Sequence, residues 1–281
     1  MIKKRSFPEH NYRAVYLNGK TMRFAIDPTK PITELDYPEF LDVKITSKCD
    51  GKCPWCYMDS KPEDHHAVDL IDKINSYFGS LTVNQKPFQV AIGGGEPTCH
   101  PDFIECLKAF HAHGICPNYT TNGMWVNQGN AQSIIKNTKL YCGGVAVSCH
   151  PHLKPYWERA ARLYADAGIK LNFHIIISDK DSVDRFIEIY EEWKDQIDYF
   201  VLLPYGAQGR AVEKDIDWDY FVEKAPQNSS KLAFGANFYP YLMKDQKHFD
   251  VSLYEPEIMS KFMDMSDMSI HKSSFRLNEK D

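Results

Sequence analysis

Alternating strand-like and helix-like segments occupy most of this 281-residue chain and constrain its fold more than any other feature. Short apolar runs typical of buried strands alternate with segments that have the apolar period of helices. The expected strands are residues 40–46, 88–94, 115–123, 143–150, 169–178 and 197–206. The expected helices are residues 68–78, 101–114, 131–137, 155–168 and 182–193. Successive β-α units of this kind predict an α/β fold in which right-handed crossovers join parallel strands.

The most unusual short motifs of the chain follow the ends of these expected strands. Cys49 follows the first strand, Gly93–Pro97 the second, Asn122 the third, Ser148 the fourth and Pro204–Arg210 the sixth. In parallel β-α barrels the carboxyl ends of the strands carry the functional residues. We therefore expect these five motifs to meet at one face of the fold.

The segments on either side of the alternation read as short elaborations. Asn18-Gly19 between two alternating apolar runs predicts a β-hairpin, because both residues of such a turn take positive φ. Beyond Ala211 the alternation fades, and residues 217–225 and 254–265 are expected to be helical. The predicted divisions are an N-terminal hairpin and connector (1–39), a core barrel (40–211) and a C-terminal extension that could cap a substrate pocket (212–281).

Composition indicates a cytoplasmic location. The first ten residues are basic but lack the apolar core of a signal peptide, and the longest apolar runs fall far short of the ~20 residues of a membrane span. With 33 Lys and Arg against 38 Asp and Glu, a dedicated nucleic-acid binder is not expected. In a reducing compartment the eight cysteines are ligands, catalysts or core residues rather than disulfides.

Three cysteines lie within eight residues in the pattern C-x3-C-x2-C, formed by Cys49, Cys53 and Cys56. They could bind zinc, with His65 or His66 as the fourth ligand. Cys53 and Cys56 could instead form a redox pair, which would leave the third thiol without a role. Iron–sulfur clusters normally take four cysteines, so a cluster held by three would leave one iron open to another ligand.

The second expected strand ends in a motif suited to binding such a ligand, since Gly93, Gly94 and Gly95 precede Glu96 and Pro97. Glycines let a backbone approach a ligand closely. The Glu96 carboxylate, or a carbonyl beside it, could accept hydrogen bonds from a ligand's ammonium group. A zinc site explains neither this motif nor its place at the same face as the cysteines.

The C-x3-C-x2-C and GGEP motifs together resemble those of radical S-adenosylmethionine (SAM) enzymes, over about residues 40–211. The resemblance implies a partial (βα)6 TIM-like barrel. It also implies a [4Fe-4S] cluster held by Cys49, Cys53 and Cys56, with SAM chelating the remaining iron. Reductive cleavage of SAM would then give a 5′-deoxyadenosyl radical that abstracts hydrogen from a substrate.

The same resemblance assigns SAM contacts to residues that follow the strands. The segment LPYGAQGRA resembles one found in the branch that contains molybdenum-cofactor and peptide-maturation enzymes. The implied contacts are Trp55 near the adenine, Gly94, Gly95, Glu96 and Pro97 at the methionine amino group, Ser148 and Asn122 near the ribose, and Gly209 and Arg210.

The branch resemblance implies a peptide or protein side chain as the substrate. Two departures weigh against it: no cysteine follows Cys149 to hold auxiliary clusters, and about forty N-terminal residues are too few for a leader-peptide domain. A small metabolite or nucleotide, and a partner enzyme that receives a glycyl radical, are therefore alternatives, as is a non-catalytic iron–sulfur or zinc protein. The enzyme would also need a reducing partner such as flavodoxin or ferredoxin.

The five other cysteines have different expected roles. Cys106, Cys116 and Cys142 are expected to pack in the core. Cys99 and Cys149 each lie just past a strand end, where hydrogen donation to a radical is an alternative to packing.

Overall fold

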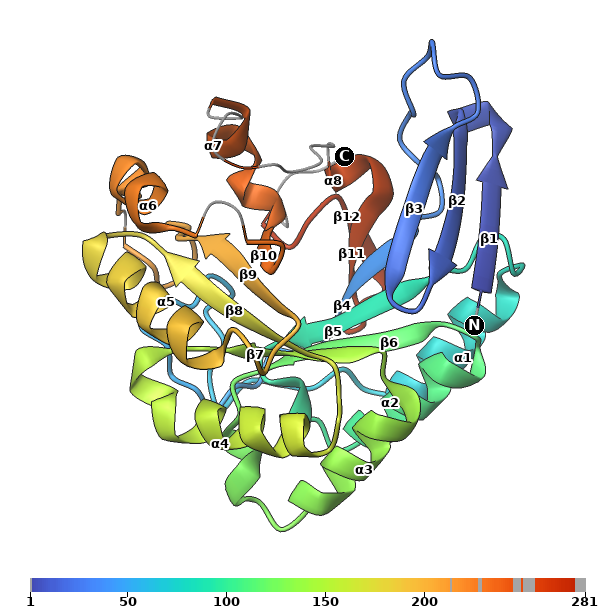
Figure 1. The fold of residues 1–281 in the computed structure, drawn as a ribbon. Coiled ribbons are helices and arrows are strands. Elements are labelled where there is room, and N and C mark those ends of the chain that lie inside the picture. The colour runs from blue at the N-terminus through green and yellow to red at the C-terminus, as the bar shows by residue number, and fades with distance from the viewer. Residues whose placement is uncertain (1, 213, 227–228, 245–248, 250–255, 276–281) are drawn as a thin grey trace.

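A computed structural model describes residues 2–212, 214–226, 229–244, 249 and 256–275 of the chain. These residues form a nine-stranded sheet with the order β10-β9-β8-β7-β6-β5-β4-β11-β12 and a separate three-stranded sheet, β1-β2-β3 (Figure 1). No helix among them is long and apolar enough to cross a membrane.

The six strands expected from the sequence form the centre of the large sheet. Each is the parallel neighbour of the next one along the chain, as right-handed β-α units require. They are β4 (Phe40–Thr46), β5 (Gln89–Gly94), β6 (Cys116–Thr121), β7 (Gly144–Ser148), β8 (Leu171–Ile177) and β9 (Tyr199–Pro204). The prediction of a partial TIM-like α/β barrel is confirmed.

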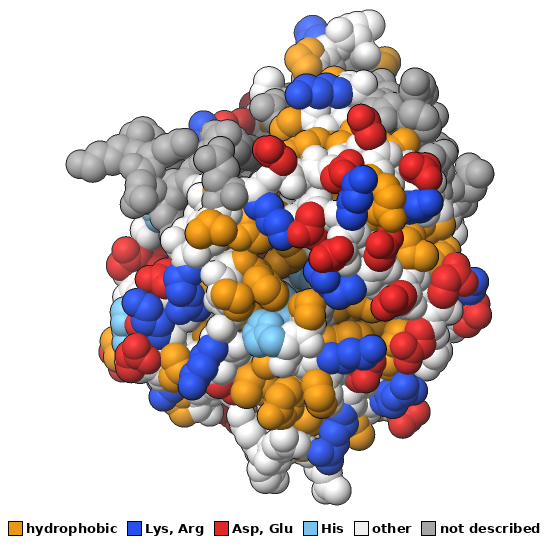
Figure 2. All heavy atoms as spheres, turned by 90° about the vertical axis from the view of Figure 1, so that its left-hand side faces the viewer, with side chains coloured by type: hydrophobic (Ala, Val, Ile, Leu, Met, Phe, Trp, Pro, Cys, Tyr) orange, Lys and Arg blue, Asp and Glu red, His pale blue; other side chains and the backbone are white. Residues whose placement is uncertain are grey.

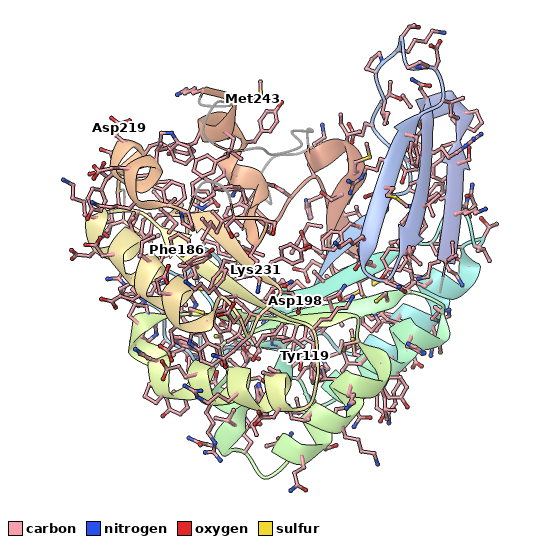
Figure 3. All side chains as sticks on the ribbon, in the orientation of Figure 1. Tyr119, Phe186, Asp198, Asp219, Lys231 and Met243 are labelled. Carbon is pink, nitrogen blue, oxygen red and sulfur yellow. The ribbon has the colours of Figure 1, made fainter. Side chains whose placement is uncertain are left out.

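Five helices cover the outer face of this sheet (Figure 1). They are α1 (Leu70–Ser80), α2 (Phe103–Ala112), α3 (Ala131–Tyr141), α4 (Lys154–Asp166) and α5 (Lys180–Trp193). Figure 3 shows Tyr119 of β6 and Phe186 of α5 within this layer, and the Tyr119 hydroxyl lies 2.8 Å from Thr138 Oγ1 and 2.7 Å from the Tyr164 hydroxyl. Gly114 and Gly168, the last residues of two expected helices, follow α2 and α4 with positive φ.

Alternate residues of each strand point to opposite faces of the sheet. On β4, Leu41, Val43 and Ile45 are buried in the main core cluster beneath the helices. Asp42 and Lys44 therefore face the inner side of the curved sheet, which we call the lumen. The lumen is the side on which the C-terminal extension and the N-terminal sheet lie (Figure 1).

The C-terminal extension adds strands to both edges of the sheet. Helix α6 (Trp218–Lys224) confirms the prediction for residues 217–225, and α7 (Tyr239–Lys244) follows β10. Strand β10 (Leu232–Phe234) pairs in parallel with β9, and β11 (Ser260–Asp264) in parallel with β4, while β12 (Ser269–His271) runs antiparallel to β11. The extension thus contributes to the barrel wall itself.

The prediction of a helix over residues 254–265 is wrong within its described part. Only α8 (Pro256–Met259) is helical, and Ser260–Asp264 is strand β11. The edge of β4 has backbone groups that need partners, and pairing with β11 satisfies them. This long-range pairing outweighs the local preference of the segment for a helix. Residues 254 and 255 lie outside the described residues.

The N-terminal hairpin is confirmed by β2 (Tyr12–Leu17) and β3 (Lys20–Ala25), with φ of 50° at Asn18 and 88° at Gly19. A further strand, β1 (Ile2–Phe7), pairs antiparallel with β2. This sheet has a small core of its own, which includes Tyr12 and Phe88. The buried Arg5 guanidinium donates to the carbonyls of Tyr37 and Pro38 and so ties the sheet to the connector.

Candidate functional site

The carboxyl ends of the central strands bring the predicted motifs together. Figure 2 views the molecule from the side on which β8 and β9 end in Figure 1. This face is hollowed near its centre, and hydrophobic and histidine side chains surround the hollow. The contacts below link the residues that follow β4, β5, β6, β7 and β9 into one site.

The three motif cysteines lie on a loop that follows β4 and is folded back on itself. The Cys49 N–H donates to the Lys61 carbonyl at 3.0 Å, and the Cys56 N–H to the Cys53 carbonyl at 3.3 Å. All three thiols belong to half-buried, unbridged cysteines. Burial raises the pKa of Cys49 above its ordinary value and that of Cys53 to about 11, so these thiols ionise only with a positive partner such as a metal.

The glycine motif packs directly against the start of the cysteine loop. Gly95 N–H donates to Thr46 O at 2.7 Å, and Glu96 N–H to Lys48 O at 2.9 Å. A Cβ atom on Gly95 would lie 2.1 Å from Lys48 O, and one on Gly94, where φ is +112°, would lie 2.3 Å from Thr46 O. The glycines are therefore needed for close contact with the loop backbone, a reason that the motif alone did not indicate.

Glu96 joins the ends of β5 and β6 from a buried position. Its Oε1 accepts hydrogen bonds from Thr98 N, Thr98 Oγ1 and Thr121 Oγ1, and its Oε2 accepts one from Asn122 N at 2.7 Å. Burial raises the pKa of Glu96 to about 7, although these hydrogen bonds oppose the shift. The carboxylate is thus largely committed to the protein, which favours neighbouring backbone carbonyls as acceptors for a ligand's ammonium group. Pro97 is buried beside it.

Asn122 connects the end of β6 to the cysteine loop. Its Nδ2 donates to Asp50 Oδ1 at 2.8 Å, while its Oδ1 accepts from Met124 N at 2.9 Å. Asp50 directly follows the first motif cysteine, so Asn122 holds the loop at the strand ends.

Trp55 lies against the residues that follow β7. Its ring is 5.8 Å from that of His150 and 5.4 Å from that of His152, and both contacts are edge-on. His152 Nε2 donates to Gly51 O at 3.0 Å. Trp55 Nε1 is buried and has no hydrogen-bond partner among the described residues. A buried donor without a partner is costly, so this indole N–H is suited to a ligand acceptor. Sequence reasoning did not single out His152.

Gly209 and Arg210 fasten the other end of the cysteine loop. Gly209 has φ of +60°, and its Cβ would lie 2.4 Å from Cys56 O. Arg210 N–H donates to that same carbonyl at 3.0 Å, and its guanidinium donates to Ser60 O at 2.8 Å and lies 3.5 Å from Asp59 Oδ1. Both residues therefore position the loop.

An aromatic residue of the C-terminal segment, Phe275, lies against the loop as well. The Tyr57 ring stacks on that of Phe275 with centroids 4.5 Å apart, and the Tyr57 hydroxyl donates to Ser274 Oγ at 3.4 Å. Gln208 Nε2 donates to Phe275 O at 3.3 Å. This contact joins three segments far apart in sequence, which is why the sequence did not predict it.

The arrangement disfavours a closed zinc site. His66 Nδ1 bonds Thr46 Oγ1 at 2.9 Å and its ring is 5.0 Å from that of His100, while His65 is exposed. Within the described ranges, no three His, Cys, Asp or Glu side chains converge on a position for a single metal ion. A structural zinc site needs four ligands around one ion. A [4Fe-4S] cluster takes each thiolate on a different iron, so three separated thiols on one loop fit a cluster better.

Most of the remaining cysteines pack in or against the hydrophobic core. Cys106 is fully buried as expected, and Cys149 is buried with its thiol 3.7 Å from Val147 O. Cys116 and Cys142 are half-buried and pack against the two core clusters. Cys99 is half-buried at the functional face, and its proposed hydrogen-donor role stays a prediction.

Comparison with curated proteins finds partial matches to maturases. The mycofactocin maturase MftC of Mycobacterium ulcerans (strain Agy99) is 32% identical over 99 residues, which are 33% of this chain and 25% of the relative. The same maturase of Mycobacterium tuberculosis (strain H37Rv) is 32% identical over 96 residues, 32% of this chain and 22% of the relative. The chain thus spans about a quarter of the length of these relatives.

Solved structures share the fold at low sequence identity. Streptococcus suis SuiB bound to S-adenosylmethionine superimposes with a TM-score of 0.65 at 18% identity, over 88% of this chain and 63% of SuiB. The enzyme anSMEcpe with bound AdoMet gives a TM-score of 0.55 at 15% identity, over 85% of this chain and 72% of that one. The family model described as the Radical SAM superfamily matches residues 43–203, more than half of the sequence. On this match, and with its motifs assembled at the strand ends, the chain belongs to the radical SAM superfamily.

Proposed function

We propose that this protein cleaves SAM reductively and uses the resulting 5′-deoxyadenosyl radical to abstract hydrogen from a peptide side chain. The observation that carries the proposal is the assembly of the C-x3-C-x2-C loop, the GGEP motif and Asn122 at one face, joined through Glu96 and Asp50. When bound, the [4Fe-4S] cluster would supply the electron for cleavage. Cys49, Cys53 and Cys56 are the residues that would hold it.

The protein's own contribution is positioning. Arg210 and Gly209 hold the loop at Cys56, and Asn122 holds it at Asp50, so the thiols are fixed between two strand ends. The unpaired Trp55 Nε1–H is available to an adenine nitrogen, and Ser148 lies at the end of the adjacent strand β7. Such fixed placement is what lets a cofactor react with one substrate and exclude competing reactions.

A peptide substrate is supported by the names of similar proteins. Those curated relatives are maturases, and one solved relative of the same fold is SuiB bound to the precursor peptide SuiA. The low identity and partial coverage make the substrate of this chain a proposal. A reducing partner such as flavodoxin or ferredoxin would deliver the electron.

The test is anaerobic reconstitution with iron and sulfide, followed by reduction, addition of SAM and mass-spectrometric quantification of 5′-deoxyadenosine. We expect product from the wild-type protein and none from Cys53→Ala, which should also bind less iron. Cys116→Ala is the matched control, because Cys116 lies at the opposite end of its strand and packs against the N-terminal core. Product from Cys53→Ala equal to that from wild type would contradict the assignment.

A second experiment tests whether the substrate is a peptide. Pools of synthetic peptides should accelerate 5′-deoxyadenosine formation more than pools of nucleosides or small metabolites. Acceleration by the metabolite pools alone would favour the alternative substrate class while leaving SAM cleavage established.

A further inference from the structure

Two strands of this barrel, β5 and β7, carry small residues on the lumen face, where a closed barrel is filled. The interior of a TIM barrel is packed by layers of bulky branched side chains. Here the lumen faces of β5 and β7 carry Ala91, Gly93, Gly144 and Ala146. A Cβ atom on Gly93 would meet no other atom within 4 Å. The lumen therefore has room beside Gly93, near the carboxyl end of β5, for part of a substrate.

The described residues of one lumen wall, formed by β6 and β8, are uncharged. Asn118 of β6 donates to Gln89 Oε1 at 3.1 Å. On β8, Asn172 and His174 alternate with buried residues and so face the lumen, and His174 is in register with Ser148. Burial lowers the pKa of His174 to about 4, so its imidazole is neutral near pH 7. This wall offers hydrogen bonds without an ionic partner.

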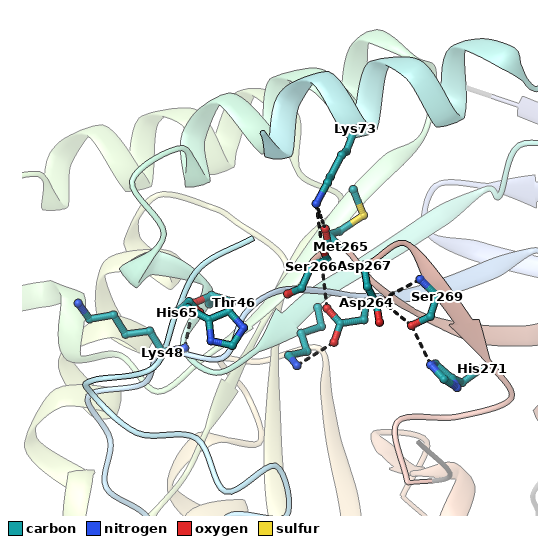
Figure 4. Close-up of polar contacts among 11 residues, drawn as sticks. Thr46, Lys48, His65, Lys73, Asp264, Met265, Ser266, Asp267, Ser269 and His271 are labelled. Carbon is teal, nitrogen blue, oxygen red and sulfur yellow. Dashed lines mark hydrogen bonds and ion pairs between the residues drawn. The ribbon is translucent and has the colours of Figure 1, made fainter. Parts of the chain in front are cut away.

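The opposite wall, formed by β4 and β11, contains an ion pair. Lys44 Nζ lies 2.8 Å from Asp264 Oδ2, on neighbouring strands whose registers match (Figure 4). Lys73 of α1 donates to the carbonyls of Met265 and Ser266 and so holds the turn that carries Asp264. The charge of Lys44 is therefore already compensated within the protein.

Asp42 lies two residues earlier on the same face of β4, and no described residue compensates its charge. Its register neighbours are Ala91 on β5 and Phe262 on β11, neither of which can pair with a carboxylate. Among the described residues no hydrogen bond or ion pair reaches the Asp42 carboxylate, which is exposed to the lumen. Burial raises the pKa of Tyr57 to about 12, and the nearby Asp42 carboxylate adds to this shift, so an aromatic ring lies near the same space.

We propose that Asp42 binds a positively charged group of the substrate, an ammonium or guanidinium, inside the lumen. The inference rests on the proposed function, since it assumes that the lumen holds the substrate of the radical reaction. A carboxylate surrounded by protein is stabilised by a cation and destabilised by an apolar ligand. A single metal ion is a poor occupant, because no group of three acidic, histidine or cysteine side chains among the described residues is placed to hold one.

The distance between Asp42 and the end of β4 constrains the length of the substrate. It lies four residues before Thr46 at the end of β4, or about 13 Å at the usual rise per residue of a strand. The thiol loop begins beyond that end. A substrate whose charge meets Asp42 and whose reacting carbon lies near the strand ends must be extended, as a long basic side chain is.

The experiment measures binding of three probes of equal chain length, hexylammonium, hexanol and hexanoate, to the reconstituted, SAM-loaded protein by NMR titration. We expect hexylammonium to bind about tenfold or more tightly than hexanol, as a charge-assisted contact provides. Asp42→Asn should abolish this preference, and Asp42→Lys should transfer it to hexanoate. Asp219→Asn, on the exposed side of α6, is the matched control and should keep the wild-type preference (Figure 3).

Equal binding of the three probes, no binding of hexylammonium, or a preference that survives in Asp42→Asn would each overturn the proposal. Thermal melting of each variant checks that it is folded. Because binding is measured without turnover, the two proposals can fail separately. Charge preference without 5′-deoxyadenosine would refute the proposed function alone, whereas SAM cleavage without charge preference would refute the lumen site alone.

Discussion

The two faces of the same strands differ in almost every respect. On the helix side, Phe173 of β8 is fully buried and its ring lies 5.5 Å from that of Trp157 on α4 and 5.1 Å from that of Trp193 on α5. On the lumen side, the adjacent residue Asn172 is half-buried and its side chain makes no hydrogen bond within the described part of the chain. Alternation along one strand therefore separates residues that stabilise the fold from residues free to serve a ligand.

This difference between the two faces explains why the functional residues need hydrogen bonds to hold them in place. Lumen and strand-end residues gain little from the apolar core, so hydrogen bonds must hold them. The cysteine loop shows this most clearly, since Asn122, Gly95 and Arg210 each bind a different part of it. Stability and function share strands but use different interactions.

The largest expected effect tests the two faces directly. Phe173→Ala should lower the free energy of unfolding by about 3–5 kcal/mol, because it leaves a cavity between the sheet and two helices. Asn172→Ala, one residue earlier and on the lumen side, should change it by about 0.5 kcal/mol or less. Urea denaturation followed by circular dichroism measures both. Similar losses for the two variants would show that the lumen is packed as tightly as the outer face.

A smaller loss of stability is expected at the end of β5, where the apolar core ends and contacts with the cysteine loop begin. Gly95→Ala places a methyl group against Lys48 O and should cost about 1–3 kcal/mol through displacement of the cysteine loop. The loop's iron content after reconstitution should fall with it. Gly93→Ala is the matched control for stability and iron content, because its Cβ would meet no other atom within 4 Å. Normal iron loading of Gly95→Ala would contradict the role assigned to this contact.

The central strands were predictable from sequence because burial on one face makes their apolar pattern strong. Strand β4 was predicted to the residue, whereas the helix expected over residues 101–114 begins only at Phe103. Strand β11 was mistaken for a helix because the open edge of β4, and not its own pattern, makes it a strand. Strand β1 was missed because Lys3, Lys4 and Arg5 interrupt its apolar residues.

The location of the site was predictable from the sequence, whereas the contacts between its residues were not. Strand-end logic located the cysteines, the glycine motif and Asn122 at one face, because parallel strands end together. Partners such as Lys48 O for Gly95, or Asn122 N for Glu96, depend on how loops fold across strand ends. No local spacing encodes such contacts. The Tyr57–Phe275 stack joins residues more than 200 positions apart and was not predictable in the same way.

The smallest expected effect is a dependence of stability on pH, which comes from Asp42 on the lumen face of β4. The surrounding protein raises the pKa of Asp42 to about 7, above the value near 3.9 of an unfolded aspartate, although the carboxylate is open to the lumen. Between about pH 4 and pH 7 the folded protein then binds more protons than the unfolded chain, so ionisation of Asp42 lowers stability as the pH rises. The other ionisable groups near this part of the lumen, Tyr57, the Lys44–Asp264 pair and His271, are unchanged in Asp42→Asn.

Asp42→Asn should therefore become more stable relative to wild type as the pH rises from 4 to 8, by less than about 1 kcal/mol because lumen water screens the charge. Binding of hexylammonium to wild type should strengthen over the same range, since only the carboxylate attracts the cation. Melting temperatures and probe titrations at pH 5 and pH 8 measure the two effects. The stability difference and the affinity for hexylammonium must change over the same pH range if a single carboxylate is responsible for both. A stability difference that does not change with pH would mean that Asp42 is solvated like a residue on the outer surface.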